Sequence, residues 1–294
     1  MTARGWVLFT AMAVIWGIPY LFIKVAVAEL SPATLVMIRT ALGAALLLPL
    51  AAARGDLRAL RPFWPVVLAY TTVEVAAPWF LLSDAERRLS SSLAGLLIAG
   101  VPLVGVVLAW LTGGEDRPDA RGVVGLVLGL VGVAFVVGLD VEADDLVAVG
   151  EVGLVVIGYS IGALLISRPL RGAPTAGVVA ASLATTALVF LPAGIAQWPR
   201  ATPSGSAVFA VAVLGVVCTA VAFLVFFALV REVGAVRATV ITYFNPVVAV
   251  LLGVAVLREP FTVGIALGFA FILLGSIVAT RRAVPHPEVE AAPS

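Results

Sequence analysis

The sequence is poor in charged residues, cysteine and histidine. Charged residues occupy 12% of its 294 positions, about half the share of a water-soluble domain. Together with a mean hydropathy of +1.16, this excludes water as the main solvent. Cys218 is the single cysteine, which excludes an intrachain disulfide framework and a multi-cysteine metal site. His286, the single histidine, lies in the C-terminal tail, so no Ser–His or metal–histidine set is expected within the membrane. The net charge of +1 indicates no nucleic-acid partner, and we expect no cofactor.

Long apolar runs dominate the chain instead. A helix needs about 20 apolar residues to cross a bilayer, and these runs are too long for barrel strands. The N-terminal run resembles a signal peptide but continues past any cleavage site, so we expect a retained first helix. The predicted fold is an all-α integral membrane protein with ten transmembrane helices, at roughly residues 5–28, 33–53, 62–82, 90–111, 122–139, 147–167, 174–196, 206–230, 236–257 and 261–280.

The distribution of arginine between the loops predicts the orientation. With the N-terminus in the cytoplasm, cytoplasmic segments hold twelve arginines and outer loops hold four, the bias expected of a cytoplasmic-membrane protein. Both termini are then cytoplasmic, and residues 283–294 form a disordered cytoplasmic tail. The four outer arginines are Arg87, Arg88, Arg200 and Arg258.

The chain contains an internal repeat. When Pro102 is aligned with Pro246, Glu115 meets Glu259 without a gap. Further correspondences are Arg87 with Arg231, Gly125 with Gly268, Gly132 with Gly275 and Pro32 near Pro174. The predicted units are residues 1–142 and 143–282, with five helices each. Because five is odd, the second unit must enter the membrane inverted, an architecture suited to alternating access.

Several motifs resemble those of a known family. They are Trp-Gly early in the first helix, "SPATLVMIR" at the second, and "NPVVAVLLGVAVLREP" followed by "GFAFILLG". Over roughly residues 5–280 the chain resembles two EamA domains of the drug/metabolite transporter superfamily. The resemblance implies ten helices around a central cavity and transport of small metabolites. Arg39 stands where the family often has an arginine, whereas Ala181 and Ile157-Gly158 depart from the pattern in the second unit.

Three charged residues lie within the predicted helices: Lys24, Arg39 and Glu74. Ionisable groups at bilayer depth usually face the interior and often function. All three belong to the outer half of the first repeat, so they could form a polar substrate site in which Lys24 and Arg39 hold a carboxylate. Alternatively, Lys24 snorkels outward, and Arg39 and Glu74 form a structural ion pair.

Glu74 is the candidate for proton coupling. Burial favours the neutral form of a carboxyl group, whereas a nearby arginine favours the ionised form. If burial dominates, Glu74 exchanges a proton during transport; if Arg39 lies close, Glu74 stays ionised and structural. The sequence leaves both alternatives open.

Aromatic and polar residues supply further candidates for substrate binding. Trp16, Tyr20 and Lys24 share one helical face beside the interruption at Pro19; the alternative is aromatic packing against a neighbouring helix. In the ninth predicted helix, Tyr243 and Asn245 precede Pro246, where Asn245 could bind substrate or cap backbone freed by the proline. Tyr159 is a weaker candidate in the sixth.

Two motifs have structural interpretations. Glu259-Pro260 suits the start of the last helix, because a carboxylate favours the positive dipole end and proline favours the first helical position. Glu115 is expected to do the same for the fifth helix. Gly125, Gly129 and Gly132 indicate close helix packing and not a nucleotide-binding loop, since no strand precedes them.

The leading functional hypothesis is a secondary transporter that exports small organic metabolites such as amino acids across the cytoplasmic membrane. No ATP-binding loop is present, so substrate gradients or coupled protons would drive it. The alternatives are a membrane-embedded enzyme and a non-transporting membrane subunit. The sequence does not specify an oligomeric state.

Overall fold

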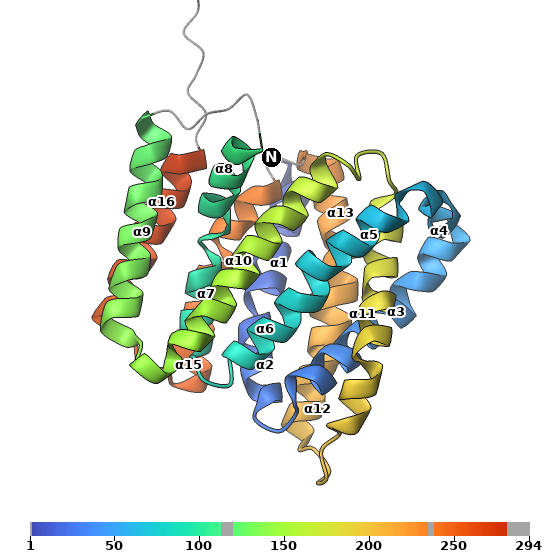
Figure 1. The fold of residues 1–294 in the computed structure, drawn as a ribbon, viewed down its shortest axis with the longest axis horizontal. Coiled ribbons are helices and arrows are strands. Elements are labelled where there is room, and N and C mark those ends of the chain that lie inside the picture. The colour runs from blue at the N-terminus through green and yellow to red at the C-terminus, as the bar shows by residue number, and fades with distance from the viewer. Residues whose placement is uncertain (1, 113–119, 235–237, 281–294) are drawn as a thin grey trace, which may run out of the picture.

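The computed structural model describes residues 2–112, 120–234 and 238–280. Within these ranges all regular structure is helical (Figure 1). Glu115 and the tail at 283–294 lie outside the described residues, so the predictions made for them are not addressed by the structure.

The first half of the chain contains the helices that form its first five crossings. The first and second crossings are α1 (Ala3–Gly17) with α2 (Pro19–Val27), then α3 (Pro32–Ala53). A short connection, α4 (Asp56–Ala59) and η1 (Arg61–Phe63), leads to the third crossing, α5 (Trp64–Tyr70), η2 (Thr71–Ala76) and α6 (Ala77–Ala85). The fourth consists of α7 (Ser91–Ile98) and α8 (Val101–Leu111), and the fifth is α9 (Ala120–Asp140).

The second half repeats this order. Its first two crossings are η3 (Ala143–Asp145) with α10 (Leu146–Ser167), then α11 (Thr175–Ala196). The next consists of α12 (Gly205–Ala212), η4 (Val213–Val221) and α13 (Ala222–Val233). The last two are η5 (Thr239–Tyr243) with α15 (Asn245–Leu257), and α16 (Val263–Thr280).

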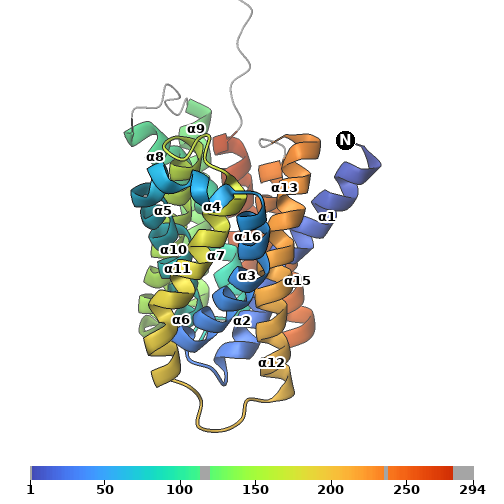
Figure 2. The same ribbon diagram turned by 90° about the vertical axis from the view of Figure 1, so that its right-hand side faces the viewer.

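The lengths of these helices confirm the predicted membrane crossings. In the described part of the chain, nine helical stretches are long and apolar enough to span a bilayer, from Ala3–Val27 to Val240–Leu257. The shorter apolar stretch Val263–Ala279 supplies the tenth. An even number of crossings brings the start and the end of the chain to the same side of the bundle, as the start of α1 and the end of α16 show in Figures 1 and 2.

Equivalent helices of the two halves pack against each other. The second crossings, α3 and α11, lie side by side at one flank of the bundle, and the fifth crossings, α9 and α16, at the other (Figure 1). Between them, α1 packs on α13, and its counterpart α10 packs on α6. This reciprocal pairing is the arrangement that a two-fold axis between inverted halves produces.

Glycines bring α9 and α16 into backbone contact. A Cβ atom added to Gly275 would lie 2.5 Å from the backbone nitrogen of Gly129 and 2.6 Å from the carbonyl oxygen of Gly125. Side chains larger than hydrogen would therefore separate the two helices, as expected for small-residue packing in membranes.

The fourth crossing of each half is interrupted at an equivalent place. The helix breaks at Ala99–Gly100 between α7 and α8, and at Phe244 between η5 and α15. Ser276 of α16 joins both breaks: its hydroxyl donates to the Ala99 carbonyl at 3.1 Å, and its carbonyl accepts from the Tyr243 hydroxyl at 3.3 Å. Interrupted helices expose backbone groups in the bundle interior, where transporters bind substrates and ions.

Polar contacts link the halves at the end opposite the termini. Glu29, after α2, accepts from the Ser204 backbone N–H at 2.7 Å and from the Ser204 hydroxyl. These hydrogen bonds lower the pKa of the exposed Glu29 carboxyl. The Thr262 hydroxyl donates to Asp140 at 2.7 Å. This end of the bundle is therefore held together by two polar contacts between residues that are distant in sequence.

Candidate functional site

Arg39 lies in the interior on α3 and is 6% exposed. Its Nε donates to the Thr219 hydroxyl in η4 at 3.2 Å. Its guanidinium carbon lies 3.7 Å from the centre of the Trp79 ring in α6, a cation–π contact that stabilises a desolvated cation. Trp79, which the sequence-based prediction did not include, thus fixes the plane of the Arg39 guanidinium. The Nη1 and Nη2 groups of Arg39 are further hydrogen-bond donors.

Glu74 lies in the π-helical segment η2 and faces α10. Its Oε2 atom is buried without a hydrogen-bond partner among the described residues. A Cβ atom on Gly162 would overlap this carboxylate oxygen, so the glycine of α10 leaves the space that Glu74 fills. The ion pair with Arg39 that the sequence left open is not among the salt bridges of the described residues.

Tyr159, also on α10, connects the two main regions of the core. Its ring is partly buried and packs against both of the larger clusters of buried apolar side chains, one around Tyr20 and the other around Trp79. Its predicted part in substrate binding stays a prediction, placed one helical turn from Gly162 and therefore beside Glu74.

Lys24, on α2, directs its ammonium group to the turn between α6 and α7. Nζ donates to the carbonyl oxygens of Glu86 at 2.7 Å and Leu89 at 2.8 Å. Carbonyls at a helix C-terminus lack intrahelical partners, so Lys24 satisfies them. It is not bonded to Arg39 or Glu74 in the described structure, and its predicted contact with substrate stays a prediction.

Trp16 and Tyr20 lie on opposite sides of the interruption between α1 and α2. The Trp16 ring packs on Phe226 with ring centres 4.9 Å apart, and on Phe223 at 6.2 Å. Tyr20 is 7% exposed and packs close to Gly95 of α7. These are the aromatic helix contacts that the sequence held open as the alternative to a substrate-lining stripe.

Tyr243 and Asn245 lie at the break before α15. The Tyr243 hydroxyl contacts the Ser276 carbonyl. In the orientation that satisfies its amide, the Asn245 side-chain nitrogen donates to the carbonyls of Ile241 at 3.1 Å and Ala13 at 3.3 Å. Asn245 therefore bonds backbone at the interruption, which is one of its two predicted roles.

The prediction for Glu259 was wrong about which helix it serves. Its own helix, α16, begins only at Val263. The Glu259 carboxylate instead accepts from the backbone N–H groups of Ser91 and Ser92, at 2.7 and 2.9 Å, and from the Ser92 hydroxyl at 2.5 Å. It thus caps the N-terminus of α7 in the other half, where a negative charge is favoured. Glu259 therefore does lie at the positive end of a helix dipole, as predicted, but tertiary packing places it at α7 and not at α16.

Glu86 is a second interior carboxyl, and the sequence-based prediction did not include it. It follows α6 directly, is fully buried, and has no hydrogen-bond partner for either carboxylate oxygen among the described residues. It lies in a charged stretch, "SDAERRLS", that is typical of a solvated loop. The available signal was its helical spacing, because Trp79, Leu82, Ser83 and Glu86 recur on one face, and the first three are buried.

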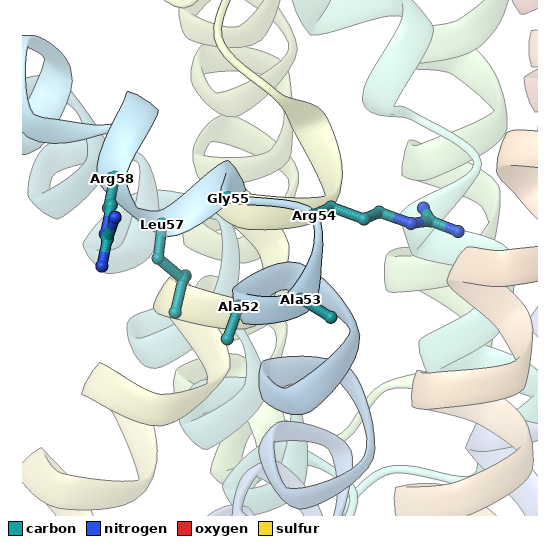
Figure 3. A pocket seen from close by; sticks show the side chains of 6 residues that line it. All are labelled: Ala52, Ala53, Arg54, Gly55, Leu57 and Arg58. Carbon is teal, nitrogen blue, oxygen red and sulfur yellow. The ribbon is translucent and has the colours of Figure 1, made fainter.

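A hollow on the surface lies apart from these residues. It is formed at the turn from α3 to α4 by Ala52, Ala53, Arg54, Gly55, Leu57 and Arg58 (Figure 3). The side chains of Arg54 and Arg58 extend in different directions and do not converge on a common point (Figure 3). The hollow includes none of the predicted site residues.

Comparison with known proteins identifies the family. The model of the EamA-like transporter family matches residues 3–138 and 152–281, and the chain belongs to this family. It is therefore an all-helical transporter with duplicated halves, not an enzyme. Its place is the cytoplasmic membrane, which it crosses several times.

Relatives cover nearly the whole chain. The chain is 28% identical to the uncharacterized inner membrane transporter YedA of Escherichia coli K12, over 97% of this chain and 95% of that protein. It is 24% identical to the uncharacterized transporter YvbV of Bacillus subtilis, over 92% and 89%. A solved structure with 23% identity superposes with a TM-score of 0.68 over 95% of this chain and 97% of that one, which supports the fold.

Proposed function

We propose that the protein is a secondary exporter of small organic metabolites that carry a carboxylate, such as amino acids. It works by alternating access, with both termini in the cytoplasm and Glu74 as its proton-coupling group. The observation that carries the proposal is the reciprocal packing of equivalent helices around interior charged residues. Inverted halves that exchange conformations expose a central site to each side in turn.

The interior residues support a carboxylate substrate. The guanidinium of Arg39 stacks on the Trp79 ring, and its Nε donates a hydrogen bond to Thr219. A guanidinium matches a carboxylate through two parallel hydrogen bonds, and its remaining donors suit this geometry. Tyr20 and Tyr159 lie within electrostatic range of Arg39, so the groups around it are few and mostly aromatic, as is usual in sites for small molecules.

The placement of Glu74 supports proton coupling. Its buried oxygen has no partner in the described structure, and no cation forms a salt bridge with it there. An unpaired carboxylate in an apolar interior is strongly disfavoured. Glu74 is therefore suited to carry a proton in the closed bundle and release it on exposure to water.

The arginine distribution supports the orientation. The connections at the end of the bundle that holds the termini contain most of the arginines, as cytoplasmic loops do. Export as the direction rests on the family resemblance alone.

Transport into proteoliposomes tests the proposal. Wild type, Glu74→Gln and the matched control Glu232→Gln would be assayed with a panel of amino acids and other metabolites, with and without an imposed pH gradient. We expect the gradient to drive flux in wild type and control, while Glu74→Gln exchanges substrate without responding to the gradient. Flux that ignores the gradient in all three proteins would contradict proton coupling; no flux of any panel compound would contradict the substrate class.

A further inference from the structure

The turn that follows α6 encloses a carboxyl group that the proposed transport cycle does not use. Glu86 is 0% exposed, and both of its carboxylate oxygens are buried without a partner in the described structure. It lies twelve residues after Glu74 on the same crossing, about 18 Å further along a helix that rises 1.5 Å per residue. Glu86 is therefore a site separate from Glu74, at the end of the bundle opposite the termini.

The cations near Glu86 are engaged elsewhere. Lys24 of α2 bonds the backbone carbonyls of Glu86 and Leu89, not the Glu86 carboxylate. Arg88 turns outward to Glu151 at 2.9 Å and to Asp84, and Arg87 also pairs with Asp84. Arg39 of α3 is held by Trp79 and Thr219.

The remaining ionisable neighbours are acidic or neutral. Glu259, from the loop before α16, acts electrostatically on Glu86 while it caps α7. Tyr20 of α2 and Tyr159 of α10 also lie within electrostatic range. Burial raises the pKa of the Glu86 carboxyl well above its ordinary value; Lys24 and Arg39 oppose this effect, and Glu259 adds to it.

An ionised Glu86 would be a buried charge without a salt bridge among the described residues, which is strongly disfavoured. A protonated Glu86 avoids this cost. If the turn at 86–90 opens, water reaches the carboxyl and the proton is released more easily. Because a proton bound more tightly by one conformation favours that conformation, acidic conditions stabilise the closed turn.

We propose that Glu86 is a second proton-binding site, which takes up a proton as the 86–90 turn closes and loses it as the turn opens. Lys24 stabilises the closed form of this turn, because its two hydrogen bonds connect the turn to α2. The proposal deepens the proposed alternating-access function, on which its role in transport rests. Proton binding itself is a property of the folded protein and needs no substrate.

Thiol labelling of the purified protein in lipid nanodiscs tests the proposal. Cys218→Ala removes the only cysteine. In this background, Leu89→Cys places a reporter at a residue that is 2% exposed in the closed turn. Arg87→Cys, at a position 56% exposed, reports the intrinsic dependence of thiol reactivity on pH. The measured quantity is the ratio of the two maleimide labelling rates between pH 5.5 and 8.5.

We expect the labelling rate of Leu89→Cys, relative to that of Arg87→Cys, to rise with pH. In the pH range where Glu86 is protonated in the closed form and ionised in the open form, the rise is up to about tenfold per pH unit. Glu86→Gln should give a low ratio at every pH, since the amide resembles the protonated acid. Glu86→Asp should retain a pH dependence, and Lys24→Met should raise the ratio throughout. The proposal is overturned if Glu86→Gln keeps the profile of its parent, or if the parent ratio does not change with pH.

Two further arms separate proton binding at Glu86 from proton coupling at Glu74 and from binding of a metal cation. Glu74→Gln should leave the labelling profile intact, so that failure of the proton-driven transport assay and failure of this proposal can be told apart. Replacing choline chloride by sodium chloride at pH 8 should have no effect. Slower labelling of Leu89→Cys in sodium would instead assign the site to a metal cation and overturn proton binding.

Discussion

The first half of the chain carries charged groups in its interior, where the second half carries apolar or small ones. Pro102 and Pro246 set an offset of 144 residues, which relates Glu74 to Cys218 and Glu86 to Val230. The offset of 142 between Pro32 and Pro174 relates Arg39 to Ala181, and the early alignment of Trp16 with Ile157 relates Lys24 to Leu165. The backbone arrangement is nevertheless reciprocal, with equivalent helices in contact.

This difference separates two requirements of a transporter. Alternating access needs two similar halves, because each must adopt the conformation that the other leaves. Binding a substrate or proton needs only one set of polar groups at the interface between them. In this chain the interior charges belong to one half, and the second half contributes partners such as Thr219 and Gly162.

The largest expected effect comes from breaking the symmetric contact itself. Gly275→Leu would push a side chain into the backbone of Gly125 and Gly129, which cannot move aside without separating α9 from α16. We expect a loss of stability of about 3 kcal/mol or more and little folded protein. Size-exclusion chromatography and thermal unfolding in detergent would measure this.

The matched control for that variant is Gly138→Leu. Gly138 lies on α9, and an added Cβ atom there would meet no atom within 4 Å. The control should fold and melt close to wild type. Equal melting temperatures for the two leucine variants would contradict the importance of the α9–α16 contact.

The second-largest effect is expected from a substitution that gives the first half the same interior residue as the second half. Arg39→Ala copies Ala181 and removes the cation that Trp79 and Thr219 hold. We expect transport of carboxylate substrates to fall by about 10- to 100-fold, as the loss of a charged hydrogen bond predicts. Arg39→Lys should not restore it, because an ammonium lacks the planar fork.

Initial rates in proteoliposomes would measure the effect of Arg39→Ala, with Arg168→Ala as the control. Arg168 is at the exposed end of α10, where it contacts Thr112. If Arg39→Ala transports at the wild-type rate and only melts earlier, Arg39 is a structural residue and the substrate assignment fails.

The smallest effect is expected from weakening the contact between Glu259 of the second half and the N-terminus of α7 in the first half. Glu259→Gln keeps the shape of the side chain but removes the charge that caps α7. We expect a loss of about 1–3 kcal/mol, the range for hydrogen bonds to charged groups. Thermal unfolding would show this as a lower melting temperature, while Glu142→Gln, at an exposed position, should be neutral. A neutral Glu259→Gln would mean that the backbone donors of α7 find other partners.

Much of the fold could be predicted from the sequence, because apolar runs of the right length have few alternatives in a membrane. The repeat was visible from Pro102 and Pro246, whose interrupted helices the structure places at equivalent points. The identities of interior charged residues were also visible, since Lys24, Arg39 and Glu74 interrupt apolar runs.

The partners of those residues could not be predicted. Lys24 bonds a turn 62 and 65 residues away, and Glu259 caps a helix start 167 and 168 residues away. Such contacts depend on how helices distant in sequence are packed, which hydrophobic periodicity does not specify. Glu86 was missed for the related reason that its exposed neighbours, Arg87 and Arg88, gave the stretch the composition of a loop.

The two π-helical segments lie at matching places in the two halves. The segment η2 spans Thr71–Ala76, and η4 spans Val213–Val221. With the offset of 144, the first maps onto residues 215–220, inside the second. A π-turn is rare, local and often found at functional sites, and here it occurs at matching places in both halves. The wide turn is therefore common to the two halves, whereas the acidic side chain within it belongs to the first half alone, since Cys218 stands where the first half has Glu74.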